Sequence, residues 1–283
     1  MYSTLVGELL CCPICQLPLE EQSGTLRCER SHSFDLAREG YVNVLRKKVL
    51  GDTKEMLQAR RAFFDKGYYQ PVSDALNALL IAHLPQRRTT PIHLLDAGCG
   101  EGYYSGRLYE QLYATGEQVI NLGIDISKDA VRMAAKRYPA SFFLAADLKE
   151  ALPVRDSILD CMLNIFAPRN IPEYARVLIP DGLFLVVIPG PNHIQQLREE
   201  LHLLQIEENK QQHVIEQCGT HFDLIDTHPL TYDLALQHSE IVQIVTMTPN
   251  FWHLTDEQRA LMAAMTALTI TVDVIYLLFR RKP

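Results

Sequence analysis

Four potential metal ligands lie near the N-terminus of the chain in two close pairs. Cys12 and Cys15 are separated by two residues. Cys28 and His32 follow after 12 further residues and are separated by three. Two such corners joined by a loop are the arrangement from which tetrahedral zinc sites are built, and thiolates with one imidazole favour zinc over calcium or magnesium. Cys11 competes with Cys12 for the first position, but the two-residue spacing favours Cys12.

A disulfide framework is the alternative use of these cysteines, and it requires an oxidising compartment. The chain has seven cysteines, an odd number, and Glu8 interrupts the short apolar stretch at its N-terminus. No basic segment precedes that stretch, so we expect no secretory signal. No apolar run reaches the length of a membrane span either. We therefore expect a cytoplasmic protein that does not act in a membrane.

A glycine-rich turn is the second feature that could do chemistry. A short apolar run ends in Asp96 and is followed by three alternating glycines, Gly98, Gly100 and Gly102. This pattern predicts a buried strand, a tight turn and the start of a helix. The next apolar run, residues 119–124, ends in Asp125, whose carboxylate could accept hydrogen bonds from both hydroxyls of a ribose. The two segments together predict a nucleoside-binding α/β domain.

The details of this turn narrow the choice of nucleoside. A dinucleotide fingerprint requires a third glycine where this chain has Tyr103, and no phosphate-binding loop of the G-x-x-x-x-G-K-[ST] type occurs. The short turn after Asp96 resembles instead the first motif of class I S-adenosylmethionine-dependent methyltransferases. An ordinary glycine-rich strand-to-helix turn is the alternative.

The rest of the chain supplies alternating elements that would position these residues. With 283 residues, 47% of them hydrophobic, it can bury one large core and one small one. Apolar runs predict strands at 92–96, 119–124, 142–146, 159–165 and 183–188. Helices are predicted between or before these strands, at 51–66, 73–83, 103–114, 128–138 and 172–178. This alternation predicts an α/β fold with a doubly wound, mostly parallel sheet. Residues Ala267 to Phe279, rich in β-branched side chains, predict a last antiparallel strand.

Ligands of such sheets lie beyond the carboxyl ends of the strands, so side chains there are candidates for the site. Asp147 could bind an adenine amino group, or it could cap a helix. Asn164 and Phe166 follow the fourth strand, where an acceptor base would be held, and Phe166 could stack on that base or belong to the core. His193 follows the fifth strand and is either a pocket residue or an ordinary loop histidine.

Charge is unevenly distributed along the chain. The net charge is −7, but residues 27–66 hold ten Lys or Arg against six Asp or Glu. The basic residues form two short runs, Arg46-Lys47-Lys48 and Arg60-Arg61. A phosphate backbone would be attracted to this part of the chain and repelled from the acidic remainder, although solvated basic faces are also common.

Several motifs, spread in order from about residue 10 to the end, together resemble one family. They are Cys12-Pro-Ile-Cys15, Cys28 with His32-Ser-Phe-Asp35, Glu39-Gly-Tyr-Val-Asn43, Met56-x-x-Ala-Arg-Arg-x-Phe-Phe64, Gly67-Tyr-Tyr-Gln-Pro71, Asp96-x-Gly-Cys-Gly-Glu-Gly-Tyr-Tyr104 and Pro189-Gly-Pro-x-His193. The chain thus resembles the bacterial 23S rRNA (guanine-N1)-methyltransferases of the RlmA type.

The resemblance implies a class I methyltransferase fold with an N-terminal zinc module that helps to recognise a hairpin of 23S rRNA. It implies S-adenosylmethionine as methyl donor, N1 of a guanine as acceptor and structural zinc held by Cys12, Cys15, Cys28 and His32. It also implies that Tyr69, Gly100, Glu101 and His193 contact the cofactor. Gly98 and Asp125 join this set on general class I grounds. Near Asp147 and Asn164 the sequence departs from the family pattern, so no role is carried over to them.

On this basis we expect three segments: a zinc-binding RNA-recognition module at 1–48, a helical linker at 49–85 and a methyltransferase domain at 86–283. A homodimer that holds one RNA between two zinc modules is compatible with this division. Two other functions fit part of the pattern. A small-molecule methyltransferase would explain the glycine turn and Asp125 but not the zinc module. A non-catalytic RNA-binding protein would explain the zinc module but not the intact cofactor motifs.

Overall fold

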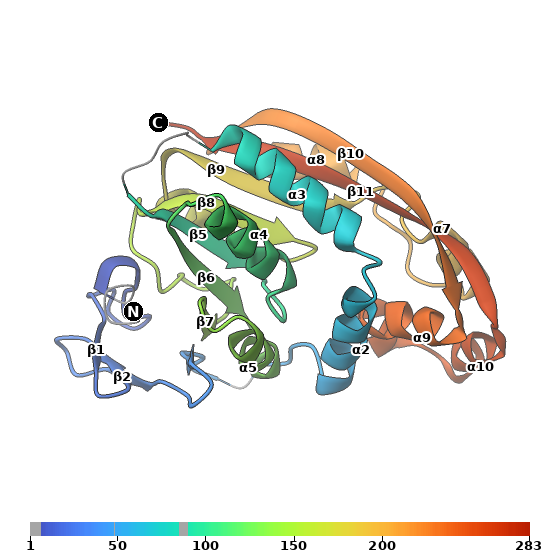
Figure 1. Ribbon diagram of the computed structural model, residues 1–283, viewed down its shortest axis with the longest axis horizontal. Coiled ribbons are helices and arrows are strands. Elements are labelled where there is room, and N and C mark those ends of the chain that lie inside the picture. The colour runs from blue at the N-terminus through green and yellow to red at the C-terminus, as the bar shows by residue number, and fades with distance from the viewer. Residues whose placement is uncertain (1–6, 48, 85–89) are drawn as a thin grey trace.

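The computed structural model describes residues 7–47, 49–84 and 90–283. An eight-stranded sheet forms its centre (Figure 1). Across the sheet the strands follow the order β10 (Phe222–Gln237), β11 (Ala267–Arg281), β9 (Leu178–Pro189), β8 (Leu159–Ile165), β5 (Ile92–Ala97), β6 (Val119–Asp125), β7 (Phe142–Ala145) and β4 (Tyr41–Asn43). Lys48 of the predicted basic run and the predicted boundary at 85–86 lie outside the described residues.

The sheet is parallel from β9 to β4, and only β10 and β11 run antiparallel to their neighbours. The predicted mostly parallel sheet with an antiparallel last strand is therefore confirmed. Strand β10 was not predicted, because most of its side chains are half-buried or exposed and no apolar run marks it. It lies at the edge of the sheet, paired with β11 along its whole length, which also explains how it accommodates Pro229.

Helices cover both faces of the sheet, as a doubly wound fold requires. In β9, the odd-numbered residues from Leu183 to Val187 belong to one hydrophobic core and the even-numbered residues from Phe184 to Ile188 to the other. The first core includes residues of α2 (Lys54–Asp65), α3 (Gln70–His83), α4 (Tyr103–Ala114), α7 (Gln195–Glu200) and α9 (His238–Thr246). The second includes residues of α6 (Ile171–Val177) and α8 (Lys210–Cys218), while α5 (Lys128–Arg137) packs near β6 and β7.

The N-terminal segment packs on the β7 edge of the sheet (Figure 1). It contains a small antiparallel sheet of β1 (Glu20–Gln22), β2 (Thr25–Arg27) and β3 (Ser33–Asp35). The chain then enters β4, which pairs with β7 in the large sheet. Leu10 forms a bridge with Val154, and the buried side chains of this segment belong to the same core as those of the large sheet. The small sheet and the large one therefore share buried surface.

A helical insertion separates the two antiparallel strands. It comprises α9, a 3-10 helix η1 (Pro249–His253) and α10 (Asp256–Ala264), and α9 packs against α2. In Figure 1 this insertion lies beside α2, at the opposite end of the molecule from the N-terminal segment. Among the described residues, no helix combines the length and apolar character needed to span a bilayer.

Candidate active site

The glycine turn lies between β5 and α4 and is closely packed by neighbouring side chains. Gly98 has a φ of +90°, and a Cβ there would lie 2.4 Å from the Cβ of Ala167, so no other residue fits. Gly100 has a φ of +53° in the left-handed region. Gly102, also left-handed, precedes the first residue of α4. The N–H groups of Gly98, Cys99, Gly100 and Gly102 are bonded within the fold, so the turn offers a ligand a close approach to the main chain at a helix N-terminus.

Asp125 organises the opposite side of the turn. Its Oδ2 accepts a hydrogen bond from the Gly100 N–H at 2.9 Å, and its Oδ1 accepts one from the Ser127 N–H at 2.8 Å. Each carboxylate oxygen retains a lone pair, so the group can still accept from two hydroxyls. Burial raises the pKa of Asp125, and these two hydrogen bonds oppose the rise. The arrangement fits the ribose-binding role predicted for this residue.

Asp96, at the end of β5, is a buried acid. Its side chain is 1% exposed, and neither carboxylate oxygen has a hydrogen-bond partner among the described residues. Burial raises the pKa of Asp96 to about 7, with nearby Ser105 opposing the rise and the Asp125 charge adding to it. A buried carboxylate beside the glycine turn would favour a positively charged group in its neighbourhood, such as the ammonium of an amino-acid ligand.

The raised pKa of Asp96 makes a stability prediction. An acid with a higher pKa in the folded chain stabilises folding below its unfolded pKa, and this contribution is lost as pH rises through about 7. In the cofactor-free protein, the ionisation of Asp96 should therefore lower the free energy of unfolding as pH rises from its unfolded pKa to about 7. The decrease should be up to about 1.4 kcal/mol per pH unit. Asp96→Asn should show a flatter profile than the wild type when urea unfolding is measured between about pH 5 and about pH 8. Parallel profiles for the two proteins would contradict the assignment.

Three of the predicted site residues form one group at the carboxyl ends of β8 and β9. His193 Nε2 lies 3.2 Å from Tyr69 Oη, and the His193 ring stacks on Phe166 with 6.0 Å between ring centroids. His193 Nδ1 accepts a hydrogen bond from the Asp273 main-chain N–H at 3.2 Å, so the proton of the neutral ring is on Nε2 and is donated to Tyr69. Burial lowers the pKa of His193 to about 4, although the Asp273 charge opposes this.

Phe166 is the exposed member of this group. Its side chain is 43% exposed, and its backbone has a φ of +52°, which is unusual for a residue of this size. Asn164, by contrast, is fully buried: its Nδ2 donates to the carbonyl oxygens of Ala97 and Pro168, while its Oδ1 has no partner among the described residues. Asn164 therefore joins the end of β5 to the loop that carries Phe166.

The other two predicted cofactor residues are Glu101, in the glycine turn, and Asp147, after β7. Asp147 is half-buried just after β7, and its Oδ1 accepts a hydrogen bond from the Lys149 N–H, which is a local turn. Glu101 is buried, and Arg61 donates to its Oε2 from both Nε and Nη2, at 2.9 and 2.8 Å. Its Oε1 has no partner in the described part of the chain. Burial raises the pKa of Glu101, and Arg61 opposes the rise.

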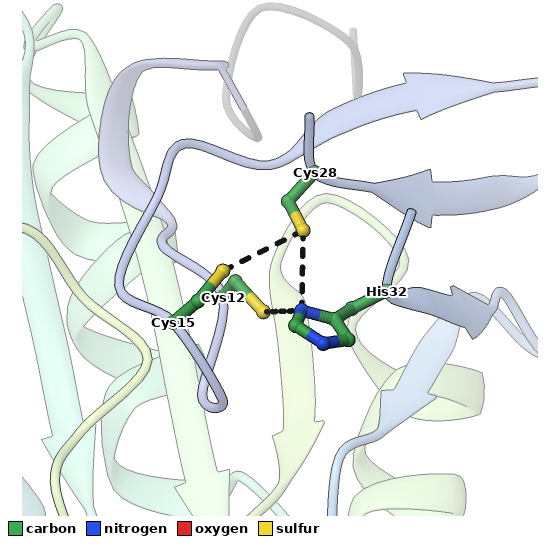
Figure 2. A group of neighbouring side chains, drawn as sticks. All are labelled: Cys12, Cys15, Cys28 and His32. Atoms are coloured by element: carbon green, nitrogen blue, oxygen red, sulfur yellow. Dashed lines mark hydrogen bonds between the residues drawn. The ribbon is translucent and has the colours of Figure 1, made fainter. Parts of the chain in front are cut away.

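The four predicted metal ligands converge at the small sheet, and Figure 2 shows their side chains pointing toward one another. All four ligand atoms lie within 4.8 Å of one another. Sγ of Cys15 and Sγ of Cys28 are 3.7 Å apart, and His32 Nδ1 lies 3.5 Å from Cys12 Sγ and 3.4 Å from Cys28 Sγ. A tetrahedron with zinc–sulfur bonds of about 2.3 Å requires sulfur atoms about 3.8 Å apart. The cluster therefore has the dimensions of a zinc site.

The structure also separates Cys11 from Cys12. Cys11 points away from the cluster, toward Gln16 Oε1 at 3.0 Å and the Leu152 carbonyl oxygen. Burial raises the pKa of the Cys11 thiol to about 11, so it stays protonated. Adjacent residues on an extended segment face opposite sides, and here Cys12 faces the other three ligands.

Comparison with known proteins decides the family. A family model described as a zinc ribbon, "RlmA, N-terminal", matches residues 10–48, and a methyltransferase-domain model matches residues 89–223. A Streptomyces fradiae protein named 23S rRNA (guanine(748)-N(1))-methyltransferase is 38% identical over 257 residues, which cover 90% of each chain. The chain belongs to the 23S rRNA (guanine-N1)-methyltransferase family.

Other members of this family match over nearly the whole length. A Micromonospora griseorubida relative is 35% identical and covers 100% of both chains, and YxjB of Bacillus subtilis is 33% identical over 97% of this chain and 98% of its own. A methyltransferase structure from Bacillus halodurans, 15% identical, matches with a TM-score of 0.52 over 75% of this chain and all of its own, which supports the fold alone. The resemblance based on the sequence motifs is confirmed, as is the combination of a class I methyltransferase fold with a zinc ribbon. S-adenosylmethionine and zinc are accordingly the cofactors of this 23S rRNA (guanine-N1)-methyltransferase family member.

Sequence reasoning missed three residues of the site. Asp52 and Arg60 form an ion pair at the glycine turn, with 2.6 Å between Oδ2 and Nη2. Asp273 holds the loop before His193, because its Oδ2 accepts from the Asn192 N–H at 2.9 Å. A charged residue inside a β-branched strand was the available signal for Asp273. The Arg60-Arg61 run was interpreted as a surface for phosphate, whereas the structure places both side chains on carboxylates.

Proposed function

We propose that this chain transfers a methyl group from S-adenosylmethionine to N1 of a guanine in a hairpin of 23S rRNA. The observation that carries the proposal is the arrangement at the carboxyl ends of the parallel strands. There Asp96 and Asp125 lie at the glycine turn, and Gly98 packs against Ala167, the neighbour of the half-exposed Phe166. The full-length similarity to proteins named as rRNA methyltransferases gives the substrate class.

Each group of the chain has a role in positioning. The cofactor supplies an electrophilic methyl carbon on its sulfonium. Asp125 would bind the ribose hydroxyls and Asp96 the ammonium, which fixes the direction of that carbon. The cofactor would lie against the main chain of Gly98, Gly100 and Glu101. The Tyr69 hydroxyl accepts a hydrogen bond from His193, so its own proton stays available for donation to the cofactor. Asp147 would bind the adenine amino group. Most of the acceleration should come from this alignment.

Phe166 would hold the acceptor guanine. N1 lies on the Watson–Crick edge of guanine, so the base must be unpaired and turned out of the helix before it reacts. An exposed ring supported from behind by His193 provides a stacking surface for such a base. Asn164 would act indirectly, by fixing the loop that carries Phe166.

His193 is unsuited to be the general base. Its Nδ1 already accepts a hydrogen bond from the Asp273 N–H, and its Nε2 carries a proton. Burial lowers the pKa of His193 to about 4. The ring is therefore neutral near pH 7 with no free lone pair. We propose that the proton on N1 leaves to solvent, and that His193 positions Tyr69 and Phe166.

The zinc ribbon would contribute to RNA recognition. Its four protein ligands complete a tetrahedron, so zinc there is structural. The segment that follows β4 carries Arg46 and Lys47 along a hollow that also includes Asp147, and Lys47 pairs with Glu150 at 3.6 Å. Basic side chains at the rim of the cofactor end would contact the phosphate backbone of the hairpin. A cytoplasmic location and a homodimer around one hairpin stay predictions.

Methyl transfer from labelled S-adenosylmethionine to unmodified 23S rRNA tests the function, with primer extension to locate the product. Methylation at N1 blocks base pairing, so we expect label uptake and one strong stop next to a single guanine. Phe166→Ala should lower the rate about 10- to 100-fold with unchanged affinity for S-adenosylhomocysteine, since one stacking contact is lost. Uptake without a stop would indicate another atom of the base. No uptake by a protein that binds the cofactor would favour a small-molecule substrate.

A further inference from the structure

Arg60 reaches from the middle of α2 to the backbone of the glycine turn. Its Nη1 lies 3.2 Å from the position that a Cβ would occupy on Gly100. The guanidinium therefore lies against the residue whose N–H is bonded to Asp125. Asp125 responds to this charge, since Arg60 lowers its pKa while Asp52 and burial raise it.

The rest of the Arg60 side chain is held in place by Nη2. This atom donates to the Met247 carbonyl oxygen at the end of α9, at 3.0 Å, and pairs with Asp52 Oδ2 at 2.6 Å. Asp52 is itself anchored beside the cofactor site, because its carbonyl oxygen accepts from Ser127 Oγ at 2.9 Å. Two elements far apart in the sequence thus fix the direction of one guanidinium.

In the described part of the chain, the hydrogen bond and the ion pair of Arg60 both involve Nη2. Among the described residues, no hydrogen bond is present at Nη1 or Nε, and the side chain is 21% exposed. Arg61, the next residue, is a useful contrast: its Nε and Nη2 both bind Glu101 and its Nη2 also donates to the Met133 carbonyl oxygen. A brace between α2 and α9 would need only Nη2. Nη1, the donor beside Gly100, is therefore available to a ligand at the turn.

We propose that Arg60 binds the carboxylate at the methionine end of S-adenosylmethionine, with Asp52 as its positioning residue. This inference deepens the proposed function and rests on it. A guanidinium suits a carboxylate because its N–H groups make charge-assisted hydrogen bonds, and with Nη2 already engaged Arg60 would donate from Nη1. Asp96 offers the complementary charge for the ammonium of the same amino-acid group. The two residues together would recognise both charges of the zwitterion at one turn.

A cycle of two ligands and two proteins tests the proposal by calorimetry, without measuring catalysis. The ligands are S-adenosylhomocysteine and its decarboxylated analogue, and the proteins are the wild type and Arg60→Met. Removing the ligand carboxylate should weaken wild-type binding about 10- to 100-fold, the range for a charge-assisted hydrogen bond. In Arg60→Met the two ligands should bind within about threefold of each other, because the interaction is already absent. Arg132→Met, which removes a surface arginine paired with Asp129 on α5, should behave as the wild type.

Two results would overturn the proposal. The first is equal binding of both ligands by the wild type. This comparison needs no variant, so it tests the proposal even if Arg60→Met fails to fold. The second is an unchanged ligand ratio in Arg60→Met, which would make Arg60 a structural brace between α2 and α9. Arg60→Gln, which is uncharged but polar, provides a second variant with the same expectation. Failure of the proposed function is distinct: the ligand cycle would succeed while 23S rRNA takes up no methyl group.

Discussion

Cys15→Ala is expected to abolish zinc binding and to lower rRNA methylation by at least about 100-fold, because the tetrahedral site loses one of its four ligands. The small sheet buries few side chains of its own, mainly Leu19 and Leu26 beside Cys12 and Cys28. Such a module depends on its metal, whose binding supplies about 10–16 kcal/mol in isolated zinc fingers. Metal analysis, limited proteolysis of the N-terminal segment and the methyl-transfer assay measure the three effects.

The same variant should bind S-adenosylhomocysteine nearly as the wild type does, since the glycine turn, Asp96 and Asp125 lie in the large sheet. Cys11→Ala is the matched control: it removes a neighbouring buried thiol that points away from the cluster. We expect it to retain zinc and methylation. Loss of cofactor binding in Cys15→Ala would contradict a purely local effect, and would show that the pairing of β4 with β7 transmits the damage to Asp147 and the cofactor site.

Asp125→Asn is expected to weaken S-adenosylhomocysteine binding about 100-fold or more, since two charge-assisted hydrogen bonds to the ribose are lost. The amide is a poor substitute for a geometric reason. Both carboxylate oxygens accept main-chain N–H groups, from Gly100 and from Ser127. An amide has one oxygen, so its NH2 group must face one of these donors. The turn is therefore expected to lose its shape as well as its charge.

Calorimetry with S-adenosylhomocysteine measures the effect, and thermal unfolding without cofactor measures the accompanying loss of stability. Asp129→Asn, on the adjoining helix, is the control: Asp129 is partly exposed and, among the described residues, its ion pair is with Arg132, so its loss should leave affinity unchanged. If Asp125→Asn bound the ligand within about threefold of the wild type, ribose recognition would have to lie elsewhere.

Local spacing carried much of the prediction. Cys12, Cys15, Cys28 and His32 are brought together by two tight corners and one short hairpin, and such short-range geometry is visible in the sequence. The strand, turn and helix around Gly98 and Gly100 are equally local. Because parallel strands align their carboxyl ends at one edge of the sheet, their order along the chain also predicted that Asp125, Phe166 and His193 would lie at that edge.

Sequence by itself thus determined the fold class, the zinc cluster and the side of the sheet on which the cofactor site lies. Only the tertiary structure decided how distant segments complete that site. The Arg60 contact with Gly100, the Asp52 pair, the Asp273 contact with His193 and the entry of β4 into the large sheet join residues far apart along the chain. Periodicity and spacing report on neighbours in sequence. They do not predict which charged side chain contacts which turn, because the packing of the whole chain sets the distances between residues far apart in the sequence.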